Sequence, residues 1–341
     1  SVILHITSDA DIDVHRTNGE PIPQLILTCP DYVCRNYHEL VETESYPPCY
    51  RIIPTLSIFT IHSWMSALQL ERFEQKASQL SERLKRCNSN WEDAFFITLA
   101  RNFGFGLNGD AFETWANRIP LRAVDKHRDE LFQIEAFFFG QAGLLQGTAG
   151  DEYYLRLKKE YEYLSHKFGL TPMDVSQWRF LRLRPTNFPH IRIAQLAVLY
   201  HRSYGLLSRI MEAETVTKVH EILKGGTSAY WVNHYTFEHP SPSRPKTLSN
   251  SSLDLLIINT VATFLYSYGI HKGKEEYCAR AGAFLEELKA EYNYITRMWE
   301  QCGIKAANAS DSQALIQLKK EYCDKKKCLY CRIGYEYLKR N

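Results

Sequence analysis

The sequence has few of the features that would place it in a compartment or assign it a reaction. It has nine cysteines in 341 residues, an odd and sparse set that argues against the disulfide framework of small secreted proteins. Its 41 Lys and Arg nearly balance its 39 Asp and Glu, and a net charge of +2 gives no general attraction for polyanions. We therefore expect reduced thiols in a cytoplasmic protein, and any polyanion site must be a local patch.

The sequence also lacks a clear membrane segment. The longest apolar run, residues 255–270, is interrupted by polar residues and is shorter than the roughly 18–20 residues that a span needs. It predicts a buried core helix, and we expect no membrane partner. No nucleophile motif, phosphate-binding loop or metal-hydrolase motif stands out. The sequence thus leaves open whether the protein is an enzyme and what its oligomeric state is.

The hydrophobic pattern changes near residue 60. Residues 1–60 alternate as β-strands do, and Asn18-Gly19 between two such segments is typical of a type I′ hairpin turn. A segment with this small number of strands cannot close an independent sheet. We therefore expect it to be the tail of a sheet whose other strands lie upstream of Ser1. Residues 61–341 follow a helical period. The predicted class is α+β: a short β segment with an incomplete sheet, then a large all-α multi-helix domain without further strands.

Several predicted helix ends carry recognisable signals. Ser89 or Asn90 can cap a helix that has two acidic residues in its first turn and Gly104 just past its end. Further helices are predicted over residues 152–168 and, as one continuous element, over residues 274–301.

Four long phrases carry a resemblance to a known family: LARNFGFGLNGDAFETWA at 99–116, KHRDELFQIEAFFFGQAGLL at 126–145, LRPTNFPHIRIAQLA at 183–197 and SQALIQLKKEYCDKKKCLYCRIG at 312–334. The chain resembles the uncharacterised bacterial domain of unknown function 2851 family over nearly its whole length. The family has no established activity to carry over. Its members have a further N-terminal segment whose acidic pattern is similar to the metal-binding core of restriction-endonuclease-like nucleases. The resemblance therefore implies a nuclease-like region that is largely missing from this chain.

Three thiols lie close together near the C-terminus, at Cys323, Cys328 and Cys331. A closed zinc site needs four tetrahedral ligands, and these residues supply three. Cys302 is the predicted fourth ligand, because a helical hairpin would bring the ends of the two helices that carry Cys302 and Cys323 together. We expect zinc, with an iron–sulfur cluster as the alternative metal centre. Ordinary buried thiols in a reducing cell are the competing interpretation.

A second cluster interleaves arginines with aromatic residues between positions 178 and 192. The arginines are Arg179, Arg182, Arg184 and Arg192. Pro189 in the first turn of the following helix, with Asn187 as a possible cap, would leave free backbone N–H groups beside these guanidiniums, which is the chemistry of an anion site. The alternative is that the arginines pair with carboxylates of neighbouring helices.

These features together favour a nucleic-acid-processing or nucleic-acid-binding protein. Its helical part would bind a phosphate backbone through the arginines, and any nuclease centre would lie upstream. The alternative is a non-enzymatic helical scaffold for protein–protein interaction. A carboxylate in an apolar helix, Glu135, is also expected to be buried and to need a partner such as Arg101.

Overall fold

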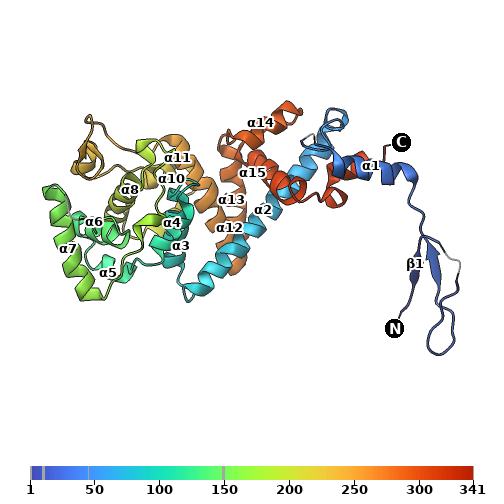
Figure 1. Ribbon diagram of the computed structural model, residues 1–341, viewed down its shortest axis with the longest axis horizontal. Helices are drawn as coiled ribbons and strands as arrows, with labels where there is room; N and C mark the ends of the chain where they lie inside the picture. The colour runs from blue at the N-terminus through green and yellow to red at the C-terminus, as the bar shows by residue number, and fades with distance from the viewer. Residues whose placement is uncertain (1, 10–11, 45, 148–149, 341) are drawn as a thin grey trace. The chain divides into compact units, whose positions relative to one another are not determined.

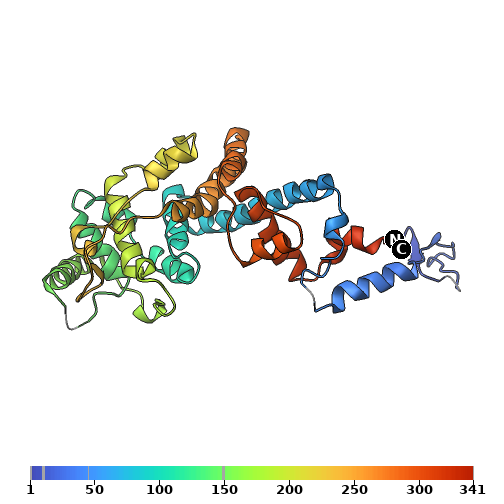
Figure 2. The same cartoon turned by 90° about the horizontal axis from the view of Figure 1, so that it is seen from above.

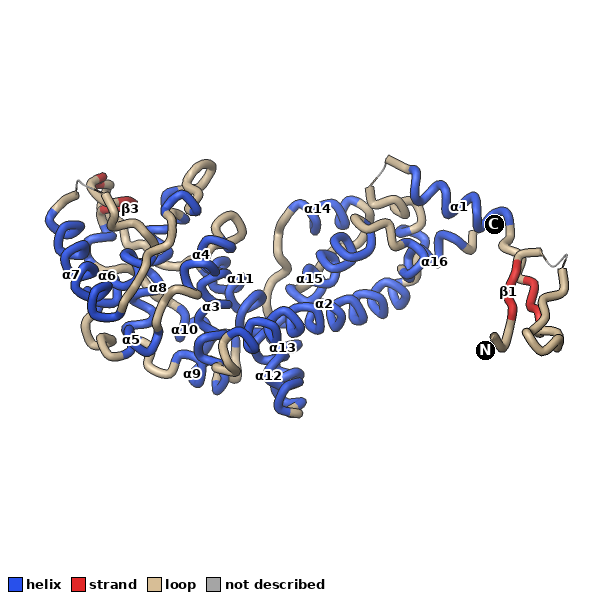
Figure 3. The backbone as a smooth tube through the Cα atoms, turned by 60° about the horizontal axis from the view of Figure 1, so that its bottom comes forward, coloured by secondary structure: helices blue, strands red, loops and turns tan. Residues whose placement is uncertain are grey.

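Helices dominate the chain, and the strands among the described residues form two small pairs (Figure 3). The computed structural model describes residues 2–9, 12–44, 46–147 and 150–340. The predicted α+β class, a short N-terminal β segment before a large helical part, is confirmed. The chain forms two compact units. The first contains Ser1–Arg72, Ala290–Ala307 and Asp311–Asn341, and the second contains Phe73–Lys289 and Asn308–Ser310.

The first unit joins the N-terminal segment to the C-terminal helices. Its elements are β1 (His5–Thr7), β2 (Gln24–Ile26), α1 (Asp31–Glu42), η1 (Ile53–Thr55), the first half of α2 (Ile58–Arg86), α14 (Tyr294–Gln301), most of α15 (Ala309–Gln317), the π-helical η6 (Leu318–Cys323), η7 (Cys328–Tyr330) and α16 (Arg332–Leu338). The C-terminal helices, red in Figures 1 and 2, lie beside the blue start of α2. There the Trp64 and Tyr322 rings pack edge to face at 5.3 Å. Trp64, Leu68, Trp299 and Leu315 are buried in this core.

The N-terminal β segment is smaller than the sequence predicts. β1 and β2 pair in parallel, with His5 opposite Gln24, and α1 already begins at Asp31. The expected hairpin is present, because His15 and Pro21 form an antiparallel bridge. The predicted type I′ turn is wrong: that turn needs positive φ at both central residues, and here only Gly19 has it, at +85°.

The second unit is built almost wholly from helices. Its elements after the end of α2 are α3 (Trp91–Phe103), α4 (Gly109–Ala116), α5 (Leu121–Asp125), α6 (Leu131–Gln141), α7 (Glu152–Phe168), η2 (Val175–Gln177), η3 (Pro185–Asn187), α8 (Pro189–Arg202), α9 (Leu206–Glu212), α10 (Val216–Leu223), η4 (Ala229–Val232), β3 (His234–Thr236), β4 (His239–Pro240), α11 (Asn250–Leu256), the π-helical η5 (Ile257–Val261), α12 (Ala262–Lys272) and α13 (Glu275–Glu287). The antiparallel pair β3–β4 corrects the expectation that no strand follows residue 60.

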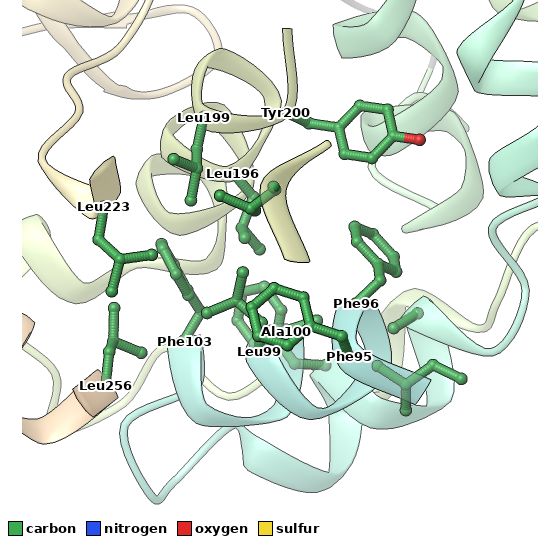
Figure 4. Packing of buried hydrophobic residues seen from close by; sticks show 14 of the residues in the cluster. Phe95, Phe96, Leu99, Ala100, Phe103, Leu196, Leu199, Tyr200, Leu223 and Leu256 are labelled. Carbon is green, nitrogen blue, oxygen red and sulfur yellow. The ribbon is translucent and has the colours of Figure 1, made fainter. Parts of the chain in front are cut away.

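The core of the second unit is centred on two helices that are apolar on most of their surface, α3 and α6. Phe95, Leu99 and Phe103 of α3 point towards leucines of three later helices, Leu196 and Leu199 of α8, Leu223 of α10 and Leu256 of α11 (Figure 4). Burial of such side chains is worth roughly 1.5–3 kcal/mol each. This packing holds α8, whose first turn carries the last arginine of the cluster.

The apolar segment Asn250–Lys272 runs as one helical stretch through α11, η5 and α12. By length and composition it could cross a membrane, but 72% of its most apolar window is buried inside the protein. It packs against α13 and α3 (Figure 1). The segment is thus placed as the buried core helix that the sequence predicts.

Candidate functional site

The arginine cluster begins on a loop between α7 and α8 that is anchored at two points. Trp178 is buried, and its indole N–H donates to the carbonyl of Ala142 at 2.8 Å. The next residue, Arg179, is held through its backbone by Asn108, which accepts from its N–H at 2.8 Å and donates to its carbonyl at 2.9 Å. The loop therefore presents its side chains from a fixed backbone.

Three of the four predicted arginines are exposed on this loop: Arg179, Arg182 and Arg184. Within the described part of the chain, none of these three guanidiniums forms an ion pair. The alternative, that the arginines pair with carboxylates of neighbouring helices, therefore does not apply to these three. The reason lies in the local sequence, since residues 175–211 contain six arginines and no Asp or Glu. Arg182 has a positive φ of +64°, so the chain turns there instead of running extended through the arginines.

The fourth arginine, Arg192, has a different environment. Its side chain lies in the first turn of α8, and only 5% of the residue is exposed. The guanidinium donates to Gln195 Oε1 at 2.9 Å and to Asn187 Oδ1 at 2.6 Å, and lies 4.3 Å from the centre of the Phe105 ring. Burial lowers the pKa of Arg192 to about 10. Arg192 is therefore an internal cation and is not part of the exposed cluster. Asn187 is not the predicted helix cap, because Phe188 occupies that position.

Glu135 is another internal charge-bearing group, and its environment corrects the expected pairing. It is 1% exposed on α6, and its carboxylate accepts hydrogen bonds from the hydroxyls of Tyr153 and of Ser228, the latter at 2.8 Å. Burial raises the pKa of Glu135 to about 7, although these hydroxyls partly oppose the shift. The predicted partner Arg101 instead pairs with Asp110 at 2.7 Å and with Glu113 at 2.5 Å.

A groove of about 630 Å³ in the second unit was not predicted from the sequence. Its walls include Glu92 and Asp93 at the start of α3, and Asp125 and Arg128 near α5. Burial raises the pKa of both Glu92 and Asp93, and Asp125 adds to each shift by charge repulsion. Asp125 is itself held by Arg128 at 2.8 Å and by the Tyr200 hydroxyl at 2.6 Å. These contacts give Asp125 a structural role in the wall of the groove.

In the first unit, the structure brings four thiols to one small cavity. Cys323 ends η6, Cys328 opens η7 and Cys331 precedes α16, so the three clustered cysteines do converge. The fourth is Cys49, from the turn before η1. Cys302 does not line this cavity, although its charge helps to raise the pKa of Cys49, so its predicted role as the fourth ligand stays a prediction.

The thiols of this cluster are shielded from water and close enough to oppose one another's ionisation. Burial raises the pKa of Cys49 to about 12, with further increases from Cys331 and Cys328. Burial, followed by the charges of Cys49 and Cys331, also raises the pKa of Cys323. Among the described residues, no three Cys, His, Asp or Glu side chains already stand at ligand positions around one point. The cysteines converge, but their sulfurs are not arranged as a metal-bound set.

These features define a predominantly helical protein with an exposed arginine loop in one unit and a buried thiol cluster in the other. The chain belongs to the family described as protein of unknown function DUF2851, which it matches over residues 1–294. That match includes the arginine loop and Cys49 and ends before Cys302 and the three C-terminal thiols. No curated protein and no solved structure matches the chain.

Proposed function

We propose that this protein binds nucleic acid through the arginine loop, defined as Arg179, Arg182 and Arg184. The observation that carries the proposal is that all three are exposed, and that none is ion-paired within the described residues. An arginine that pairs with an internal carboxylate is unavailable to a ligand, whereas an exposed, unpaired guanidinium can bind a phosphate through two parallel hydrogen bonds. Three such groups on one anchored loop match the repeated charge of a phosphate backbone.

The surroundings of the loop favour a single strand over a duplex. Phe180 and Phe188 are half-buried beside the arginines, with their rings edge to face at 5.5 Å. Leu181, between two of the arginines, is 82% exposed. Aromatic and apolar surface interleaved with cations is the combination that binds unstacked bases and their backbone together. Catalysis would require the nuclease-like region that the family resemblance implies upstream, and the binding proposal does not depend on it.

The test compares two doubly substituted proteins with the same change in net charge. Arg182→Ala with Arg184→Ala should weaken binding to an oligothymidine, and should reduce the slope of log K against log salt by about 1.4, which is 0.7 for each lost phosphate contact on a single strand. The matched control is Arg35→Ala with Arg297→Ala, two exposed arginines of the first unit. The control should keep the wild-type slope.

Two outcomes would contradict the proposal. Equal losses in both double variants would mean that only overall charge matters. No binding by the wild-type protein at low salt, where electrostatic contacts are strongest, would favour the rival function of a helical scaffold for protein partners. Circular dichroism of all three proteins checks that the substitutions leave the fold intact.

A further inference from the structure

We propose that Cys49, Cys323, Cys328 and Cys331 form one closed tetrathiolate site for a single zinc ion. Four is the number of ligands that a structural zinc site uses, and thiolate is a ligand type that it prefers. The cavity that the four cysteines line has a volume of about 20 Å³. That is space on the scale of one water molecule, which suits a single ion better than the larger body of an iron–sulfur cluster.

The local backbone of the C-terminal thiols is shaped as a tight turn around the cavity. The N–H of Cys331 bonds back to the carbonyl of Cys328 at 3.3 Å. Gly334 lies against the same turn, where an added Cβ would stand 2.1 Å from the Cys328 carbonyl oxygen. A side chain at this position would therefore push Cys328 away from the other thiols. Glycine at position 334 therefore allows Cys328 and Cys331 to stay close together.

The indole of Trp64 lies beside the sulfur of Cys331. The Trp64 indole N–H is buried, at 7% residue exposure, and has no hydrogen-bond partner among the residues that the structure describes. A buried donor without an acceptor is destabilising, and a thiolate at Cys331 would provide the missing acceptor.

Zinc binding supplies the charge that holds four thiolates together. Zinc deprotonates its cysteine ligands on binding and attracts them to a common centre. The sulfurs must turn towards that centre to bind, and rotation about the χ1 bond is the motion available to a cysteine side chain. Lys327 at the cavity wall can offset part of the negative charge of a zinc ion with four thiolates.

The site would join segments that are far apart in the chain. Cys49 lies in the N-terminal part of the first unit, and the other three cysteines lie in its last helical segment. A closed site with no open coordination position has a structural role, because it offers no place for a substrate. We infer that zinc holds the C-terminal segment against the turn before η1.

The test measures metal content in three full-length proteins: wild type, Cys49→Ser and Cys302→Ser. Wild type and Cys302→Ser should carry about one zinc per chain, and Cys49→Ser should lose most of it. Cobalt replacement of the wild-type metal gives a second readout on a folded protein. The sulfur-to-cobalt charge-transfer absorption should have the intensity of four thiolate ligands, which keeps the test decisive if Cys49→Ser does not fold.

Several results would overturn the assignment. These are zinc retained in Cys49→Ser, zinc lost from Cys302→Ser, three-thiolate intensity in the cobalt protein, or wild-type protein that binds no added zinc. Iron with labile sulfide in place of zinc would overturn the single-ion assignment. The outcome is independent of nucleic-acid binding, since the arginine loop lies in the other unit.

Discussion

At the scale of the residue, several ionisable side chains of this protein are buried without an opposite charge. Glu135, Arg192 and Lys246 are each at most 5% exposed, and within the described residues none forms an ion pair. Neutral groups satisfy them instead: Lys246 Nζ, for example, donates to the carbonyls of Trp231 at 2.6 Å and Val232 at 2.8 Å. A buried charge of this kind is expensive, so its protonation state is sensitive to pH.

Glu135 gives the clearest pH prediction. Its pKa is raised from 4.5 to about 7 in the folded protein. The folded state therefore binds the Glu135 proton more tightly, so this group's contribution to stability is complete below pH 4.5 and is lost as pH rises through 7. The upper limit of the effect is about 3 kcal/mol, because a tenfold difference in proton affinity between the folded and unfolded states corresponds to about 1.36 kcal/mol. Glu135→Gln should remove this dependence.

Urea unfolding at pH 5 and pH 8 measures the effect. The wild type should lose more stability between these values than Glu135→Gln, and the variant should be the more stable protein at pH 8. Glu162→Gln, an exposed carboxylate on α7, is the matched control and should behave as wild type. Parallel pH profiles for wild type and Glu135→Gln would show that the carboxylate is ionised at both pH values.

Individual residues also show which parts of the candidate sites could not be predicted from the sequence. The three C-terminal thiols are recognisable because they lie within nine residues of one another. Cys49 is not recognisable as a member of this cluster, because only tertiary packing brings a residue from so far along the chain to the same cavity. Arg192 did carry a usable signal: it lies between Ile191 and Ile193, both fully buried, and an arginine inside an apolar helical stretch is expected to be internal.

At the scale of the element, caps predict helix starts better than apolar periodicity predicts helix lengths. The predicted cap at Asn90 is confirmed, since its side chain accepts from the N–H groups of Glu92 at 3.0 Å and Asp93 at 3.4 Å. The predicted helix over residues 274–301 is wrong as one element, because α13 ends at Glu287 and α14 starts at Tyr294. The break had a signal, the capping box between Asn293 and Thr296.

Two glycines inside helices give predictions for the stability of the protein, and the expected changes have opposite signs. Gly140 of α6 faces α7, where an added Cβ would stand 2.0 Å from the Tyr161 ring, whereas Gly282 of α13 has open space. Gly140→Ala should destabilise the protein by about 1–3 kcal/mol through overpacking. Gly282→Ala should stabilise it by roughly 0.5–1 kcal/mol through helix propensity.

Thermal or urea unfolding of both alanine variants tests the α6–α7 contact. Because the two substitutions add the same methyl group, the difference in sign separates the effect of packing from that of helix propensity. A stabilised Gly140→Ala protein would mean that Tyr161 can move aside without cost, and that α6 and α7 are less tightly packed than the structure shows.

At the scale of the whole molecule, the two units have separate hydrophobic cores. Every member of the larger core lies in the second unit, and every member of the smaller core lies in the first. The second unit is nearly continuous in sequence, since Phe73–Lys289 lacks only Asn308–Ser310. The sequence pattern could not reveal this division, because α2 is one uninterrupted amphipathic helix across the boundary between Arg72 and Phe73.

The division predicts that residues 73–289 fold without the rest of the chain. Of the larger core, this fragment lacks only Ala309, so it should show helical circular dichroism and cooperative thermal unfolding. Because the arginine loop and its anchors Trp178 and Asn108 all lie within it, the fragment should also keep the oligothymidine affinity of the full chain and its salt dependence. A fragment that folds but does not bind would place essential nucleic-acid contacts in the first unit. A fragment without a cooperative transition would show that the second core depends on the first unit for its stability.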